Sequence, residues 1–392
     1  MYPPFRSSLV RTGALFMTWS LCCLGPTGSA AAVDADAPQQ MPLFVAGEGD
    51  YHTYRIPALV VSQRGTLLAF CEGRRSGRGD SGDIDLLLRR SFDGGRSWQE
   101  VQVVWDDGPN TIGNPCPVVD RATGTIWLPL TRNLGHDNER AIKAGTAEGT
   151  REAWITYSRD DGATWATPVD ITRQVKPSDW GWYATGPGCG IQSASGRLLI
   201  PCDHSVLGSQ EYRSHVIYSD DGGQTWQLGG AIGPRMNECQ MIERADGELL
   251  MNMRSYREEH CRAIATSRDG GLTWSSPQPD RALIEPVCQA SLIRYTDARQ
   301  HDRDRLVFAN PASRRREKLT VRLSYDEGRT WPVAQPLWEG PAAYSALAAL
   351  EDGTLVCLYE RGEQGPYETL TVARFGLDWL SDGADHRADL AR

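Results

Sequence analysis

The octapeptide SFDGGRSW at residues 91–98 decides the fold, because its pattern of Ser, Asp, Gly, Ser or Thr, and Trp returns four more times along the chain. The five copies begin at Ser91, Ser158, Ser219, Ser267 and Ser324. Asp and Ser side chains can satisfy nearby backbone N–H groups, and glycine can adopt a positive φ, so each copy predicts a turn. The tryptophan is then free to pack into a core. We therefore interpret these aspartates as structural rather than as calcium ligands or catalytic carboxylates.

Two short apolar strands joined by a polar turn precede each octapeptide, and a third strand enters it. In the first unit these strands are IPALVVS (56–62), TLLAF (66–70) and IDLLLRRS (84–91). A sixth unit lacks the octapeptide and ends in LTVARFGLDWL (370–380), which can close against an N-terminal strand such as MPLFVAG (41–47). Six such units predict an all-β domain over residues 38–380, a six-bladed β-propeller of four-stranded antiparallel blades.

Polar residues with catalytic chemistry gather on one rim of this predicted domain. The octapeptides are turns between third and fourth strands, so residues just before a first strand or just after a second strand lie on the opposite rim. Eight residues have such positions: Arg55, Arg74, Asp80, Glu238, Arg254, Arg316, Tyr344 and Glu360. Converging arginines bind a carboxylate through paired, charge-assisted hydrogen bonds. A tyrosine beside a glutamate suits a reacting carbon that carries a carboxylate, because a neutral phenol avoids like-charge repulsion.

These motifs resemble the exo-α-sialidases (neuraminidases) from about Pro42 to Leu380: the octapeptide is similar to their Asp-box, and YRIP (54–57) to their first-arginine motif. The resemblance implies a retaining hydrolase that removes terminal sialic acid from glycans through a sialyl–tyrosine intermediate, with no required cofactor or metal. It implies these catalytic residues: Asp80 as acid and base, Glu238 as activating base and Tyr344 as nucleophile. It implies these substrate-binding residues: Arg55, Arg74, Arg254 and Arg316, with Glu360 as the acid that buttresses Arg55.

Several assignments stay open between neighbours. Asp83 competes with Asp80, whereas Asp85 alternates with apolar residues and is expected to pack in its strand. Arg314 and Arg315 compete with Arg316, which we favour because it stands three residues before the first apolar residue of the next strand. The aromatic residues before the GPGCG run are expected to line the pocket for the sugar's glycerol tail: Trp180, Trp182 and Tyr183.

The first 32 residues predict a signal peptide, with Arg6 and Arg11 before a short apolar run and then small residues. The run at 14–24 is too short to span a bilayer, so the mature chain is expected to be secreted or periplasmic without a membrane span. A lipid anchor at Cys22 or Cys23 is the less favoured alternative. Residues 381–392 are expected to form a C-terminal tail.

The net charge of −9 argues against nucleic acid or an anionic membrane as a partner. Beyond the first 32 residues eight cysteines remain, without a CxxC motif or zinc-site spacing, and they predict buried thiols or one or two disulfides.

Two other functions remain as alternatives to an exo-sialidase. The first is a trans-sialidase or a hydrolase of a related nonulosonic acid, which the sequence does not distinguish from a sialidase. The second is a non-catalytic Asp-box propeller that binds a ligand or protein, but such a protein has no reason to retain the tyrosine, the acids and the arginines together.

Overall fold

A computed structural model describes residues 37–209 and 211–388. The predicted signal peptide and the alternative anchor at Cys22 or Cys23 lie outside these residues. The described chain is all-β, as predicted, with three short helices: α1 (Glu139–Ala144), α2 (Thr172–Val175) and α3 (Leu377–Leu380).

The strands form four hydrogen-bonded sheets, in which neighbours are antiparallel except for one parallel contact between β4 and β6. The nine-stranded sheet contains β2 (Thr53–Val61), β3 (Leu67–Arg74), β4 (Ile84–Ser91), β5 (Gln102–Trp105), β6 (Thr111–Gly113), β7 (Val118–Val119), β8 (Ile126–Asn133), β9 (Glu152–Ser158) and β10 (Val169–Asp170). The five-stranded sheet contains β11 (Trp180–Thr185), β12 (Ile191–Gln192), β13 (Leu198–Val206), β14 (Tyr212–Ser219) and β15 (Gln227–Ile232). The four-stranded sheet contains β16 (Met236–Glu243), β17 (Leu249–Ser255), β18 (Cys261–Ser267) and β19 (Gln278–Ile284).

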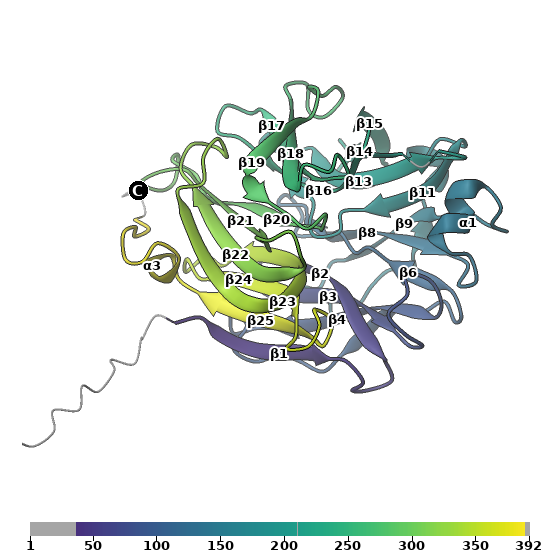
Figure 1. The fold of residues 1–392 in the computed structure, drawn as a ribbon, viewed down its shortest axis with the longest axis horizontal. Coiled ribbons are helices and arrows are strands. Elements are labelled where there is room, and N and C mark those ends of the chain that lie inside the picture. The colour runs from purple at the N-terminus through teal and green to yellow at the C-terminus, as the bar shows by residue number, and fades with distance from the viewer. Residues whose placement is uncertain (1–36, 210, 389–392) are drawn as a thin grey trace, which may run out of the picture. The chain divides into compact units, whose positions relative to one another are not determined.

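The seven-stranded sheet joins the two ends of the described chain. It contains β1 (Gln39–Val45), β20 (Ser291–Thr296), β21 (Arg305–Pro311), β22 (Glu317–Ser324), β23 (Val333–Ala349), β24 (Leu355–Arg361) and β25 (Thr369–Phe375). The purple strand β1 pairs antiparallel with the yellow strand β25 (Figure 1). This pairing confirms the predicted closure of the last unit by an N-terminal strand. Strand β23 is shared, because its first half pairs with β22 and its second half with β24.

The five octapeptides are turns after the third strand of the first five units, as predicted. In the first copy the Ser91 hydroxyl accepts from the Gly95 N–H at 2.7 Å, and Asp93 Oδ1 accepts from the Ser97 N–H at 2.9 Å. Gly95 has a φ of +85°, a conformation that favours glycine. Trp98 packs beside a buried apolar cluster. The same aspartate contact recurs in the other copies at Asp160, Asp221, Asp269 and Asp326.

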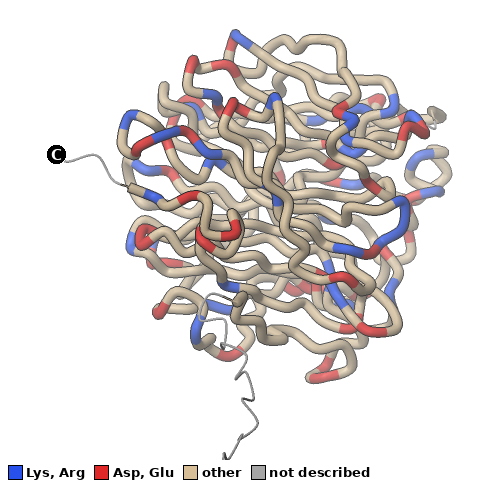
Figure 2. The backbone as a smooth tube through the Cα atoms, turned by 60° about the vertical axis from the view of Figure 1, so that its left-hand side comes forward, with Lys and Arg blue, Asp and Glu red and all other residues tan. Residues whose placement is uncertain are grey.

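The core is divided into apolar clusters that join strands from successive units. One cluster contains Phe44 of β1, Leu59 of β2, Leu358 of β24 and Val372 of β25, so the chain's two ends share one core. Charged residues of both signs are interspersed along the backbone rather than separated into faces (Figure 2). No helix among the described residues is long and apolar enough to cross a membrane.

The cysteines and the C-terminal residues are part of the packed structure. The eight cysteines of the described chain are free thiols, and seven of them are buried. Arg305 is fully buried and donates to both carboxylate oxygens of Asp385, at 2.7 and 2.6 Å. The described part of the segment 381–392 is therefore tied to β21.

Candidate active site

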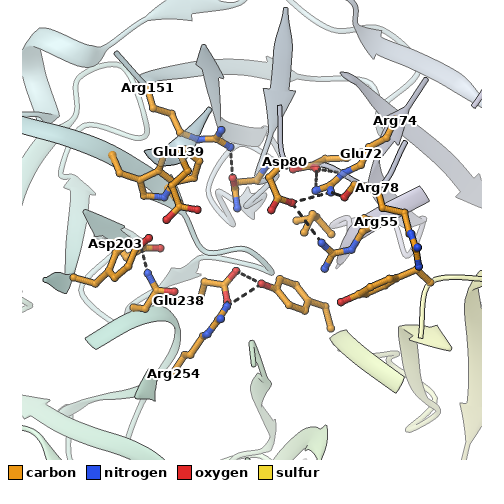
Figure 3. Close-up of a pocket in the computed structure, with 18 of the residues that line it drawn as sticks. Arg55, Glu72, Arg74, Arg78, Asp80, Glu139, Arg151, Asp203, Glu238 and Arg254 are labelled. Atoms are coloured by element: carbon orange, nitrogen blue, oxygen red, sulfur yellow. Dashed lines mark hydrogen bonds and ion pairs between the residues drawn. The ribbon is translucent and has the colours of Figure 1, made fainter. Parts of the chain in front are cut away.

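A cavity of about 340 Å³ brings the predicted rim residues together (Figure 3). All eight of them lie at this place in the fold, and all except Glu360 line the cavity. The residues that the strand-end rule selected therefore lie together in space.

Local β-bulges aim three of these side chains. Strand β2 gains one extra residue relative to β3 between Arg55 and Ala58, and Ile56 has a φ of +60°. The same irregularity occurs in β16 around Glu238 and in β23 around Tyr344. A bulge bends the strand and re-aims side chains away from simple alternation. The bulges therefore turn segments of three separate strands toward one point.

Tyr344 and Glu238 form the centre of the site. The phenol is 5% exposed and donates to Glu238 Oε1 at 2.5 Å. Arg254 Nη1 donates to Glu238 Oε2 at 2.6 Å and to the Tyr344 oxygen at 3.1 Å. Burial raises the pKa of the Tyr344 phenol well above its usual value, and the Glu238 carboxylate adds to the rise. The tyrosine is therefore neutral at rest and has a base in direct contact to receive its proton.

Glu360 orients this centre from beneath the cavity. Its fully buried carboxylate accepts from Arg55 Nε at 3.0 Å and from Arg55 Nη2 at 3.3 Å. It also accepts the backbone N–H groups of Ile56 and Tyr344, each at 3.0 Å. One carboxylate thus fixes the first arginine and the two bulged backbones, which agrees with the buttressing position expected for it.

The three consecutive arginines separate as the register argument predicts. Arg316 lines the cavity, where its Nη1 contacts the Tyr367 hydroxyl and its guanidinium lies 5.6 Å from the Tyr344 ring. Arg314 is exposed, and the Arg315 side chain is 82% exposed beside Glu317.

The two competing aspartates, Asp80 and Asp83, also lie in different places. Asp80 lines the cavity, with Oδ1 at 2.8 Å from Arg74 Nη1 and 3.5 Å from Arg55 Nη1. Partial desolvation in the cavity opposes ionisation of Asp80, but Arg74 and then Arg55 outweigh it and lower the pKa of this carboxyl. Asp83 instead pairs with Arg75 at 3.1 Å and does not line the cavity. Asp85 is fully buried in β4 and accepts from Tyr51, in line with the packing role expected for it.

The prediction that Tyr183 contacts the substrate is wrong. Alternation along β11 turns Trp182 toward the cavity and Tyr183 to the other face. Tyr183 is fully buried in an apolar cluster, with its hydroxyl 3.6 Å from Cys202 Sγ. Trp180 does not line the cavity either, because its ring stacks on His204.

Sequence reasoning missed several polar residues that line the cavity, among them Glu139, Arg151, Asp203 and Asn237. Asp203 directly follows a predicted second strand and Asn237 directly precedes a predicted first strand, so the rim rule itself could have found both. Glu139 begins helix α1 and Arg151 directly precedes β9, both in the connection after β8 that the sequence does not place. Arg151 is 2% exposed and donates to Asn133 at 2.7 Å and to Asn114 at 2.5 Å.

The cavity is electrostatically suited to an anion. Six arginines line it: Arg55, Arg74, Arg78, Arg151, Arg254 and Arg316. Of the lining acids, Asp203 and Glu139 have raised pKa values because burial penalises their charged forms, and Asp203 is the more strongly affected. A chain with a net charge of −9 thus concentrates positive charge at this place. No group of three or more metal-ligating side chains occurs in the described part of the chain.

Comparison with known proteins assigns the class. A family model described as a BNR repeat-like domain matches residues 65–357. The chain is 36% identical over 364 residues to a sialidase of Micromonospora viridifaciens, covering 87% of this chain and 54% of the relative. It is 30% identical over 398 residues to an exo-alpha-sialidase of Arthroderma benhamiae, covering 92% of this chain and 94% of the relative. The solved structure of the Hadza microbial sialidase Hz136 matches with a TM-score of 0.80 at 32% identity, covering 87% of this chain and 69% of that one.

The repeated turns and the family match thus place the chain among the BNR-repeat proteins. Within this class the chain belongs to the sialidase family. It spans about half the length of the Micromonospora relative.

Proposed function

We propose that this protein is an exo-sialidase, which hydrolyses terminal α-linked sialic acid from glycoproteins, glycolipids and oligosaccharides with retention of configuration. The observation that carries the proposal is the 2.5 Å hydrogen bond from Tyr344 to Glu238 inside an arginine-lined cavity. Arg55, Arg254 and Arg316 would hold the substrate carboxylate, because guanidinium groups bind it through paired hydrogen bonds.

The first half of the reaction forms a sialyl–tyrosine bond. The Tyr344 oxygen attacks the anomeric carbon while Glu238 takes the phenolic proton, so a neutral group approaches a carbon that carries a carboxylate. The bond from this carbon to the leaving-group oxygen breaks, and Asp80 gives its proton to that oxygen.

The second half releases sialic acid. Water attacks the same carbon, Asp80 takes a proton from the water, and the bond to the Tyr344 oxygen breaks. Glu238 returns its proton to the phenolate. Two inversions at one carbon give net retention.

The proposal also includes the overall fold and the location of the enzyme. We propose that the antiparallel units form six blades of one propeller over residues 38–380, with β1 completing the last blade. Residues 1–32 would direct export, which places the enzyme outside the cell or in the periplasm, where sialylated glycans are its substrates.

The test is hydrolysis of a fluorogenic sialoside, with other anionic and neutral glycosides as controls. A 3-fluorosialyl fluoride should then trap the enzyme, and mass spectrometry of the digest should find the added sugar on the Tyr344 peptide. Turnover of the sialoside without any label on that peptide would exclude the tyrosine route. Absence of turnover on any sialoside would exclude the function.

A further inference from the structure

Protein groups occupy the donors of Arg74, in contrast to those of Arg316. Its Nε and Nη2 donate to Glu72 Oε2 at 3.0 and 2.6 Å. Its Nη1 donates to the Arg78 carbonyl oxygen at 2.6 Å and lies 2.8 Å from Asp80 Oδ1. The Arg74 side chain is only 2% exposed. Little of this guanidinium remains to receive a second carboxylate.

Glu72 holds Arg74 from a fixed position. The carboxylate is 3% exposed, and its Oε1 accepts the Asn114 N–H at 2.9 Å. Gly113 approaches so closely that a Cβ there would lie 2.4 Å from Glu72 Oε1. Glu72 is therefore a buried anion, clamped between the β6 end and Arg74, and it leaves only Nη1 of Arg74 directed at the Asp80 loop.

Arg316 shows the contrast. It forms no ion pair with any acid of the described chain, and its guanidinium lies in the cavity near Tyr344. Such a group is available for an incoming carboxylate, whereas Arg74 already has two anionic neighbours.

We infer that Arg74 is a positioning residue, oriented by Glu72, that holds the Asp80 carboxylate at the cavity and does not bind the carboxylate of the substrate. The inference rests on the proposed acid–base role of Asp80. It assigns Glu72, Arg74 and Asp80 to one chain of contacts. This chain fixes the position of the Asp80 carboxylate and sets the pH range in which Asp80 is protonated.

The pH dependence has a defined sign. The charged groups around Asp80 are Arg74 and Glu72 of β3, Arg55 of β2, Arg151 and Glu139 across the cavity, and Arg78 of its own loop. A general acid must be protonated, so its pKa sets the alkaline limb of kcat/KM. Arg74→Gln removes the cation nearest to Asp80, raises the pKa of that carboxyl, and should move the limb to higher pH. Glu72→Gln removes the anion that offsets Arg74, and should move the limb to lower pH.

The experiment compares two substrates. The leaving group of 3′-sialyllactose needs a proton from the general acid, whereas the aryl leaving group of an aryl sialoside departs without one. For Arg74→Gln on sialyllactose we expect an upward shift of about 0.5–1 pH unit, since the Asp80 side chain is 61% exposed and partly screened. Turnover of sialyllactose should fall about 10-fold or more, with a much smaller loss on the aryl substrate. Arg74→Lys keeps the charge and should keep the limb near that of the wild type.

Affinity for an unsaturated sialic acid analogue separates positioning from substrate binding. Arg74→Gln should weaken the analogue by less than about threefold, against about 30-fold or more for Arg316→Ala. A loss equal to that of Arg316→Ala, or an unmoved alkaline limb, overturns the inference. If Glu72→Gln does not fold, the two Arg74 variants still decide the question.

A parallel Asp80→Ala measurement tests the proposed function itself. Equal losses on both substrates there would remove Asp80 from proton transfer, whatever Arg74 does. Amide hydrogen exchange over residues 76–82 then measures how firmly the Asp80 loop is held, independently of catalysis. Faster exchange in Arg74→Gln supports a holding role for Arg74, and unchanged exchange refutes it.

Discussion

Arg316→Ala removes a guanidinium that lines the cavity and has no acidic partner in the described chain. In the proposed complex this side chain supplies one arm of the clamp on the substrate carboxylate. A charge-assisted hydrogen bond contributes about 1.5–3 kcal/mol. Without the Arg316 guanidinium, the desolvated substrate carboxylate also lacks some of the hydrogen-bond donors that it needs, which adds to the loss. We therefore expect a loss of about 2–4 kcal/mol, which is about 30- to 900-fold in affinity or in kcat/KM.

The chain provides a matched control next to this residue. Arg315 carries the same charge, but its side chain is 82% exposed and its partner Glu317 lies 3.3 Å away at the surface. Exposed ion pairs contribute about 0–1 kcal/mol, so Arg315→Ala should change ligand affinity by less than about threefold. Arg316→Lys should remain poor, because an ammonium cannot reproduce the planar fork.

Calorimetric titration with an unsaturated sialic acid analogue measures these differences, with the thermal midpoint of each variant as the check on folding. The reasoning is refuted if Arg314→Ala or Arg315→Ala loses binding while Arg316→Ala retains it. Full recovery in Arg316→Lys would likewise argue against a paired contact.

Three further predictions concern the reaction and the repeated turns. Tyr344→Phe should lower kcat by several orders of magnitude with an unchanged thermal midpoint, and near-normal turnover would remove Tyr344 from the mechanism. Asp80→Ala should slow natural sialosides far more than aryl sialosides in steady-state assays, and a larger effect of Asp83→Ala would transfer the role to that residue. Asp93→Ala should cost about 1 kcal/mol of stability in denaturant titrations and leave kcat unchanged, because its contacts are local to one turn. A loss of activity per folded molecule in that variant would contradict its structural interpretation.

Much of the fold could be predicted because its determinants are local. The predicted third strand at 84–91 is the observed β4, and the Asp93 contacts with Ser97 need only the residues of one octapeptide. The distance of a residue from a strand end also placed Arg55 and Glu238 on the correct rim. The side of Tyr183 was predicted wrongly, because the sequence shows no register that tells which face of β11 meets the cavity.

The sequence by itself determined the repeating strands, their turns and the set of polar residues at the strand ends, since alternation and turn chemistry act over a few residues. Only the tertiary structure decided how those residues meet. The bulges that aim Arg55 and Tyr344 depend on Glu360, which lies 305 residues from Arg55 and binds the backbone at both bulges. The position of Asp80 beside Arg74, with Asp83 held by Arg75, is set by ion pairs within one loop, whose path in space the pattern of residue types does not contain. Burial and charge pairing act through space between distant segments, and a linear pattern does not contain those distances.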